Sequence, residues 1–289
     1  MKDERLTITQ LRDKRDKGDK LTMLTAYDYP VARIVDAAGV DMILVGDSLG
    51  MVVLGYDSTL PVTVDDMIHH GRAVVRGSQR AMVVIDMPFM SYRITVADTV
   101  RNAGRVIQAT GAQAVKLEGG RDIVGEVQAL VRAGIPVMGH VGLMPQSVNQ
   151  QGGFKVQGKD ENAARELIED ALCLEQAGAF ALVLESIPRQ LAALITERIN
   201  IPTIGIGAGA QCDGQVLVTY DMVGLFDGFV PKFVKQYAQL RGSMVQALAE
   251  YVKEVKAGQF PAKEHTFTMK DELYHTLKGA DGSEDHHDD

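Results

Sequence analysis

Five short apolar runs in this chain lead into an ionisable side chain. The runs are MILVGDS, MVVIDMP, AVKLEGG, PVMGH and ALVLESIP, and the ionisable residues are Asp47, Asp86, Glu118, His140 and Glu185. Runs rich in Val, Ile and Leu are typical of strands buried on both faces, as in a parallel sheet. The spacings between these residues, 39, 32, 22 and 45 positions, leave room for a helix between successive strands. The pattern therefore predicts repeated strand–helix units.

The rest of the chain continues this rhythm and completes a count of eight strands. The predicted strands cover residues 21–28, 42–48, 81–88, 114–120, 135–143, 181–188, 202–209 and 215–221. Helical patterns separate them, with Thr63 and Thr95 as expected N-caps and Gly111 as a C-terminal stop. A polar helix over 8–17 precedes the first strand, and a helix over 236–257 follows the last. We therefore predict an α/β fold, a (β/α)8 TIM barrel with a short N-terminal helix and C-terminal helices, rather than an open doubly wound sheet.

A closed barrel of this kind brings the ionisable residues together. The carboxyl ends of all its strands meet at one rim, so residues far apart in the sequence share one pocket. Crowded carboxylates raise one another's pKa and repel, unless a cation or a proton lies among them. A hard divalent metal ion is the simplest such cation. The Gly- and amide-rich stretch 144–164 has no periodicity and is predicted to be a lid over this rim.

Length and composition favour one large domain. With 289 residues and 46% hydrophobic content, the chain can bury the core of a single barrel, which we place at residues 1–268. The chain ends in DGSEDHHDD, so residues 269–289 are predicted to form an acidic, disordered tail. The net charge of -8 argues against nucleic acid or an anionic membrane as a partner.

Cysteine content and segment hydropathy bear on the cellular compartment. Cys173 and Cys212 lie far apart and indicate neither a disulfide framework nor a zinc cluster. Residues 1–20 lack the apolar core of a signal peptide, and no segment approaches the apolar length of a membrane span. We therefore expect a cytoplasmic protein.

Several of the rim residues also have purely structural interpretations. Lys116 and Glu118 lie two apart in a predicted strand and so face the same way, either as a buried ion pair or as part of a site. Asp47 and Asp86 each follow a full apolar run, and an Asp in that place is often a helix cap or turn former. Ser48 is suited either to capping the next segment or to binding a substrate oxygen.

The remaining candidates differ in kind. His140 fits a satisfied core histidine, or a residue that supports the acid cluster from behind. Glu185 comes from the sixth strand, across the barrel from strands two to four, where a carboxylate in a partly apolar mouth is a good general base. The glycines of GIGAG at 205–209 resemble a phosphate cradle, but small residues in a barrel strand also permit close packing, which we favour.

Several long blocks, in unbroken order over about residues 5–267, resemble the ketopantoate hydroxymethyltransferase (3-methyl-2-oxobutanoate hydroxymethyltransferase) family. These blocks are GDSLGMVVLGYDSTLPVTVDDM, KLEGG, GHVGLMPQSVNQQGGFKVQG, LESIP and IPTIGIGAG. Val141 and Met144 depart from the Leu and Thr frequent in the family, and the tail has no counterpart there. The resemblance implies a (β/α)8 barrel, a homodecamer, and Mg²⁺-dependent transfer of a one-carbon unit from 5,10-methylenetetrahydrofolate to 3-methyl-2-oxobutanoate, giving 2-dehydropantoate and tetrahydrofolate in pantothenate biosynthesis.

The resemblance also implies roles for individual residues. Asp47 and Asp86 would be metal ligands, and Glu118 would bind the metal directly or through water. Ser48 and Lys116 would hold the oxo acid, and Glu185 would accept the proton. The substrate-binding set is completed by the two metal-ligating aspartates and His140.

This chemistry agrees with the pattern of the residues. A 2-oxo acid offers a carboxylate and a keto oxygen to a divalent metal, which would stabilise the enolate formed when C3 loses its proton to Glu185. Lys116 would offset the charge of the substrate carboxylate. Two other hypotheses stay open. One is C–C or P–C lyase or mutase chemistry on an oxo acid, as in the phosphoenolpyruvate mutase and isocitrate lyase group, and the other is a noncatalytic barrel that acts as a ligand sensor or an assembly subunit. The sequence lacks an evident cysteine-bearing lyase loop.

Overall fold

Eight parallel strands close into a barrel in strict sequence order, β1 to β8. The computed structural model describes residues 5–280. The strands are β1 Leu21–Thr25, β2 Met42–Val45, β3 Met82–Asp86, β4 Ala114–Glu118, β5 Val137–Gly142, β6 Ala181–Glu185, β7 Thr203–Ile206 and β8 Gly214–Leu217. Pairing of β8 with β1, through Met23 and Val216 among others, closes the ring. The predicted TIM barrel is confirmed.

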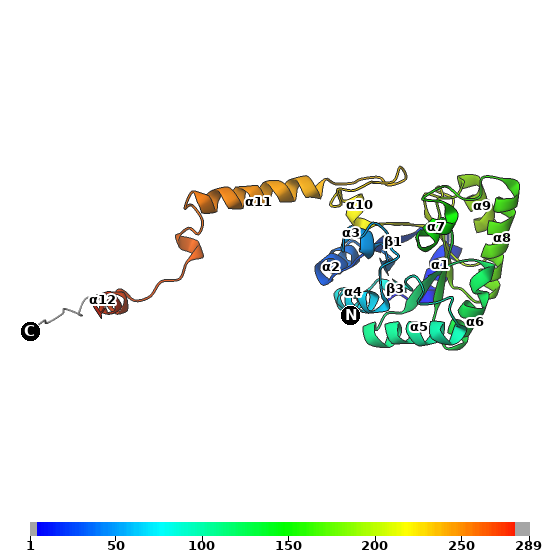
Figure 1. The fold of residues 1–289 in the computed structure, drawn as a ribbon, viewed down its shortest axis with the longest axis horizontal. Helices are drawn as coiled ribbons and strands as arrows, with labels where there is room; N and C mark the ends of the chain where they lie inside the picture. The colour runs from blue at the N-terminus through cyan, green and yellow to red at the C-terminus, as the bar shows by residue number, and fades with distance from the viewer. Residues whose placement is uncertain (1–4, 281–289) are drawn as a thin grey trace, which may run out of the picture. The chain divides into compact units, whose positions relative to one another are not determined.

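Helices surround the strands (Figure 1). They are α1 Ile8–Asp16, α2 Tyr29–Ala37, α3 Leu49–Val52, α4 Val64–Gly77, α5 Val96–Thr110, α6 Val124–Arg132, α7 Val148–Gln151, α8 Glu161–Gln176, α9 Arg189–Arg198 and α10 Thr219–Met222, with 3-10 turns η1 Arg121–Ile123 and η2 Pro145–Ser147. Thr63 and Asp66 form a capping box at the start of α4, and Thr95 accepts a hydrogen bond from the Asp98 N–H at the start of α5. Gly111 ends α5 at φ +76°. The predicted caps are therefore confirmed.

Two apolar cores follow from the alternation of side chains along each strand. Residues that point inward fill the barrel, among them Met42, Met82 and Met138, and Leu11 of α1 packs against the same cluster. Residues that point outward, such as Ile43 and Ile85, pack under the surrounding helices. The predicted N-terminal helix thus contributes directly to the barrel interior.

Two segments differ from the pattern expected from the sequence. The predicted eighth strand extended to residue 221, but β8 ends at Leu217 and α10 begins at Thr219. The aperiodic stretch after β5 contains the two short helical elements η2 and α7 before α8 begins. In both places a helix of only three or four residues is too short to produce a helical period in the sequence.

The chain separates into two compact units, with the barrel unit ending at Ala238. The second unit begins at Gln239 and contains α11 Leu240–Lys256, η3 Lys263–His265 and α12 Asp271–Ala280. The tail predicted from residue 269 therefore begins with a helix, in which Leu273, Tyr274 and Leu277 recur at helical spacing. Its last residues, 281–289, lie outside the described part of the chain. The predicted homodecamer stays a prediction.

The length and hydropathy of the helices show whether any of them could cross a membrane. Among residues 5–280, no helix combines the length and the apolar character that a membrane crossing needs.

Candidate active site

All seven residues singled out from the sequence line one cavity at the carboxyl ends of the strands. This cavity has a volume of about 410 Å³, and the seven are Asp47, Ser48, Asp86, Lys116, Glu118, His140 and Glu185. A larger depression of about 810 Å³ lies among segments that precede β5, β6 and β7, and it contains none of them. The strands explain the convergence, because Asp86, Glu118 and Glu185 are each the last residue of a strand. Asp47 lies two residues beyond β2.

A buried ion pair forms the centre of this cluster. The Nζ atom of Lys116 lies 2.8 Å from Asp86 Oδ1 and 4.0 Å from Glu118 Oε1. The Asp47 backbone N–H donates to Asp86 Oδ2 at 3.1 Å, which joins the ends of β2 and β3. As the sequence spacing predicted, Lys116 and Glu118 face the same side of β4 and line the cavity. The ion-pair interpretation of Lys116 is thus present in the structure, with Asp86 as the nearer partner.

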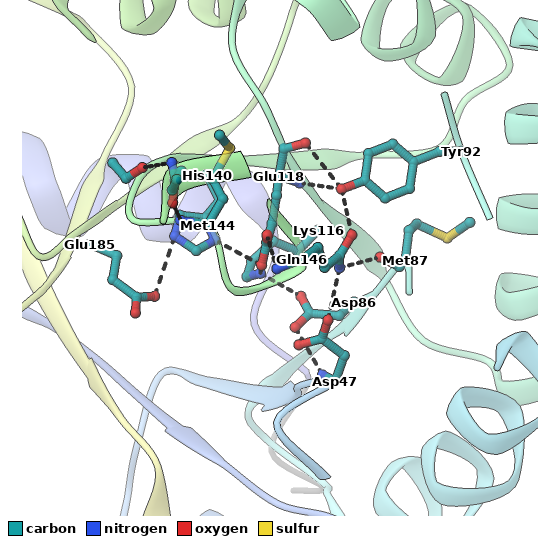
Figure 2. A network of polar contacts seen from close by, with 12 residues as sticks. Asp47, Asp86, Met87, Tyr92, Lys116, Glu118, His140, Met144, Gln146 and Glu185 are labelled. Atoms are coloured by element: carbon teal, nitrogen blue, oxygen red, sulfur yellow. Dashed lines mark hydrogen bonds and ion pairs between the residues drawn. The ribbon is translucent and has the colours of Figure 1, made fainter. Parts of the chain in front are cut away.

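His140 connects the cluster to Glu185. Its Nδ1 lies 3.6 Å from Glu118 Oε1, and its Nε2 lies 3.3 Å from Glu185 Oε2. Figure 2 shows the imidazole between these two carboxylates. Burial and the charge of Lys116 lower the pKa of His140, but the carboxylates of Glu118 and Glu185 outweigh them and raise it to about 9. The two carboxylates therefore favour the protonated imidazole, which lies between them.

The electrostatics divide the acids into two kinds. Burial raises the pKa of Asp47 well above its ordinary value, and the nearby Asp86 and Glu118 raise it further. Burial also raises the pKa of Asp86, although Lys116 opposes that effect. Burial alone would raise the pKa of Glu118, but His140 and Lys116 hold it below its ordinary value. Lys116 and His140 thus compensate the negative charge of Glu118. The charge of Asp47 is the least compensated of the three acids.

The oxygens available at this site suit a hard divalent cation. Asp86 Oδ1 is buried and lies beside Lys116 Nζ at 2.8 Å, whereas Glu118 Oε1 is buried and accepts no hydrogen bond from the described residues. As the side chains lie, no three His, Cys, Asp or Glu residues within 5–280 are grouped closely enough to hold one metal ion. Mg²⁺ is commonly held by only one or two carboxylates, with the remaining positions filled by water and substrate. The Asp47 and Asp86 pair fits that mode, and Glu118, paired with His140, fits an indirect contact.

Two residues that contact the cluster, Gln146 and Tyr92, escaped the sequence analysis. The Gln146 side-chain N–H groups donate to Asp47 Oδ2 at 2.8 Å and to the Met87 carbonyl at 2.9 Å, and its backbone N–H donates to Glu118 Oε2 at 3.1 Å. The Tyr92 hydroxyl lies 2.8 Å from Gln146 Oε1. Gln146 therefore fixes two of the cluster's carboxylates. Its only sequence signal is its place just after the fifth strand, in a stretch without periodicity.

Replacement of Gln146 by Glu tests this arrangement. A carboxylate cannot donate to Asp47, so Gln146→Glu leaves Asp47 without that donor and adds a like charge beside it. We expect the free energy of unfolding to fall by about 1–3 kcal/mol, measured by urea titration. The control is Gln150→Glu, at an exposed position on the neighbouring α7. Equal stability of the two variants would contradict the structural role given to Gln146.

Ser48 and the backbone of Glu185 are held by specific contacts. The Ser48 hydroxyl forms a hydrogen bond with the Tyr27 hydroxyl at 2.9 Å. Ser48 is the N-cap residue of α3, but its side chain accepts no hydrogen bond from that helix. The Glu185 carbonyl accepts from the Leu143 N–H at 2.9 Å. Ser186, the next residue, has φ +47°, in the left-handed region. A Cβ atom at Gly142 would lie 2.2 Å from the Glu185 carbonyl oxygen, so only glycine permits β5 and β6 to approach here.

The glycines of GIGAG pack against neighbouring side chains. A Cβ atom at Gly205 would lie 2.9 Å from Cys212 Sγ, and one at Gly207 would lie 2.7 Å from the Phe233 ring. This agrees with the packing interpretation favoured from the sequence.

Comparison with known proteins identifies the family. The model of the ketopantoate hydroxymethyltransferase family matches residues 5–263. The chain belongs to this family. It is a hydroxymethyltransferase, as its sequence blocks predicted. The 3-methyl-2-oxobutanoate hydroxymethyltransferase of Syntrophomonas wolfei is 60% identical over 94% of this chain and 99% of its own, and that of Dehalococcoides mccartyi strain 195 is 58% identical over 97% and 99%.

Solved structures with the same fold are more distant in sequence. A phosphonopyruvate hydrolase in complex with oxalate and Mg²⁺ gives a TM-score of 0.58 at 15% identity over 96% of both chains. A 2,3-dimethylmalate lyase of the PEP mutase/isocitrate lyase superfamily gives 0.57 at 17% identity, over 96% of this chain and 95% of that one. These likenesses show the fold alone. The ketopantoate hydroxymethyltransferase family match is what favours transferase chemistry over the lyase and mutase hypothesis.

Proposed function

We propose that this enzyme transfers a one-carbon unit from 5,10-methylenetetrahydrofolate to 3-methyl-2-oxobutanoate, in a Mg²⁺-dependent reaction that yields 2-dehydropantoate and tetrahydrofolate for pantothenate synthesis. The observation that carries the proposal is one cavity with a carboxylate, Glu185, on one side and the Asp47, Asp86 and Lys116 group on the other. Relatives about 60% identical carry the name of the same transferase. The proposal thus unites the family with the chemistry of the site.

The side chains divide the work of the reaction. Glu185 takes the proton from C3 of the oxo acid, and the electron pair of that C–H bond then forms the new C–C bond to the one-carbon unit. Lys116 offsets the charge of the substrate carboxylate, and Ser48 donates to a substrate oxygen. Asp47 and Asp86 would hold Mg²⁺, with Glu118 in indirect contact. When bound, the ion would supply Lewis-acid stabilisation of the negative charge that develops on the substrate. Both C–N bonds of the carrier's methylene carbon break, one as the C–C bond forms and the other as the oxygen of a water molecule bonds to that carbon. The C3 proton and one proton of the water pass to the two nitrogens, and tetrahydrofolate leaves.

His140 acts through its neighbours. Its position between Glu118 and Glu185 orients both acids, and its positive charge offsets part of theirs. It therefore keeps Glu185 turned toward the cavity rather than free to rotate.

Removal of the metal tests the proposed function. We expect the purified enzyme to exchange the C3 proton of 3-methyl-2-oxobutanoate in deuterated buffer without folate, as followed by NMR. A chelator should abolish both this exchange and ketopantoate formation, and added Mg²⁺ should restore both. Exchange that persists in chelator would contradict the metal's role. Cleavage of isocitrate or 2-methylisocitrate, with no exchange of the oxo acid, would contradict the transferase proposal.

A further inference from the structure

The outer part of the active-site cavity has a wall that the acid cluster does not use. The segment after α10 contributes Phe226, Phe229 and Phe233, and the loop after α7 contributes Phe154. Phe229 is 85% exposed and Phe154 is 56% exposed. A branched five-carbon oxo acid at the acid cluster leaves these rings uncovered, and exposed apolar groups gathered at a cavity are typical of a ligand-binding surface.

Asp221 of α10 lines the same cavity and has an unsatisfied acceptor. Its residue is 7% exposed, and its Oδ1 is buried and accepts no hydrogen bond from the described residues. Burial raises the pKa of Asp221 to about 6. Buried polar atoms in proteins are normally hydrogen-bonded, so this oxygen, which has no donor among the described residues, is a candidate acceptor for a bound ligand.

Two lysines complete the wall. Lys155 and Lys232 line the cavity mouth, and both are exposed. They come from the two segments that carry the phenylalanines. The outer cavity therefore combines one buried acceptor, several aromatic faces and two cations at the solvent side.

We propose that this outer wall is the subsite for the one-carbon carrier, with Asp221 accepting hydrogen bonds from the carrier's aminopyrimidinone ring, the phenylalanines covering that ring and Lys155 and Lys232 facing its glutamate carboxylates. The inference rests on the proposed function, because that function supplies a folate as co-substrate. An aminopyrimidinone presents adjacent N–H donors to a carboxylate, and its flat ring packs on aromatic side chains. A phosphate ligand would instead be repelled by Asp221.

The backbone supports the placement of one ring of this wall. Gly207, directly after β7, has φ +63°, and a Cβ atom there would lie 2.7 Å from the Phe233 ring. The absence of a side chain at Gly207 lets Phe233 pack directly onto the barrel rim. Contact with the barrel at Gly207 therefore holds the Phe233 ring at the cavity.

Direct binding measurements test the role of Asp221. Isothermal titration of the full-length protein with tetrahydrofolate, under anaerobic conditions, should show a Kd at least about tenfold weaker for Asp221→Asn than for the parent. The Kd for 3-methyl-2-oxobutanoate should change less than about twofold, because the oxo acid contacts the other end of the cavity. An unchanged Kd for tetrahydrofolate, or a loss confined to the oxo acid, would overturn the assignment.

The lysines are tested with carriers of different tail length. The double variant Lys155→Ala/Lys232→Ala should bind tetrahydrofolate more weakly than the parent does, and the loss of affinity should be larger for the triglutamate than for the monoglutamate. Added salt should reduce this difference between the two losses. Lys159→Ala is the matched control, since Lys159 is exposed in the same loop but does not line the cavity. An equal loss of affinity for the monoglutamate and the triglutamate would overturn the role of the lysines.

Failure of the subsite and failure of the proposed function give different results. Suppose that the parent exchanges the C3 proton of the oxo acid, and that the parent and Asp221→Asn bind tetrahydrofolate with the same Kd. The proposed subsite is then wrong, but the proposed function is not. If the parent neither exchanges that proton nor forms ketopantoate, the proposed function is wrong.

Discussion

Glu185→Gln should lower kcat for ketopantoate formation by about 10²–10⁴-fold, the range typical of losing a general base. The amide keeps the shape of the side chain but cannot accept the C3 proton of the oxo acid. Because His140 Nε2 lies 3.3 Å from Glu185 Oε2, the amide oxygen can still lie near the imidazole. The loss should therefore fall on kcat rather than on the KM for the oxo acid.

Two measurements separate this prediction from a general loss of structure. Folate-independent exchange of the C3 proton should fall in parallel with kcat, as followed by NMR in deuterated buffer. Glu197→Gln, at an exposed position on α9, should retain the parent's rate. A Glu185→Gln enzyme that still exchanges the proton at the parent's rate would show that another group is the base.

Asp86→Ala should reduce the free energy of unfolding by about 3–5 kcal/mol and abolish the response of activity to Mg²⁺. The substitution leaves Lys116 buried without its nearer partner, because the Asp86 contact at 2.8 Å is lost and Glu118 Oε1 lies 4.0 Å away. It also removes the acceptor for the Asp47 backbone N–H. Urea titration and Mg²⁺-dependent turnover give the two readouts.

An exposed ion pair provides the comparison. Asp65 on α4 pairs with Arg105 at 2.7 Å, but its side chain is 79% exposed. Asp65→Ala should therefore change the free energy of unfolding by less than about 1 kcal/mol and leave activity intact. Similar losses in the two variants would contradict the special importance of the Lys116 and Asp86 pair.

Much of this architecture was predictable from the chain because the barrel strands are buried on both faces. Their apolar runs stand out, and the polar residues that end them, such as Asp86 and Glu118, mark the rim. The closing contact between β1 and β8 is less visible, because the two strands are far apart in sequence. The expected eighth strand was too long at its end, where Val218 is followed by a helix of four residues.

The residues that were missed belong to segments without a repeating pattern. Gln146 lies in a 3-10 turn, and only its tertiary contacts with Asp47 and Glu118 reveal its part in the site. Asp221 was assigned to the eighth strand, although it too is an acid that follows an apolar run. Asp221 follows β8, so the eighth strand also has an ionisable residue after its carboxyl end, as the strands named at the start do. The partners of a side chain depend on three-dimensional placement, which the alternation of apolar and polar residues does not encode.

The left-handed backbone at Ser186 has a consequence for the stability of this enzyme. Such a conformation in a residue other than glycine costs on the order of 1–3 kcal/mol and persists only where the surroundings impose it. Here the Ser186 N–H donates to the Ile206 carbonyl at 2.8 Å, and the Ser186 carbonyl accepts from Gln157. We therefore expect a substitution that relieves the strain at residue 186 to raise the free energy of unfolding and, because it loosens the backbone next to Glu185, to lower kcat.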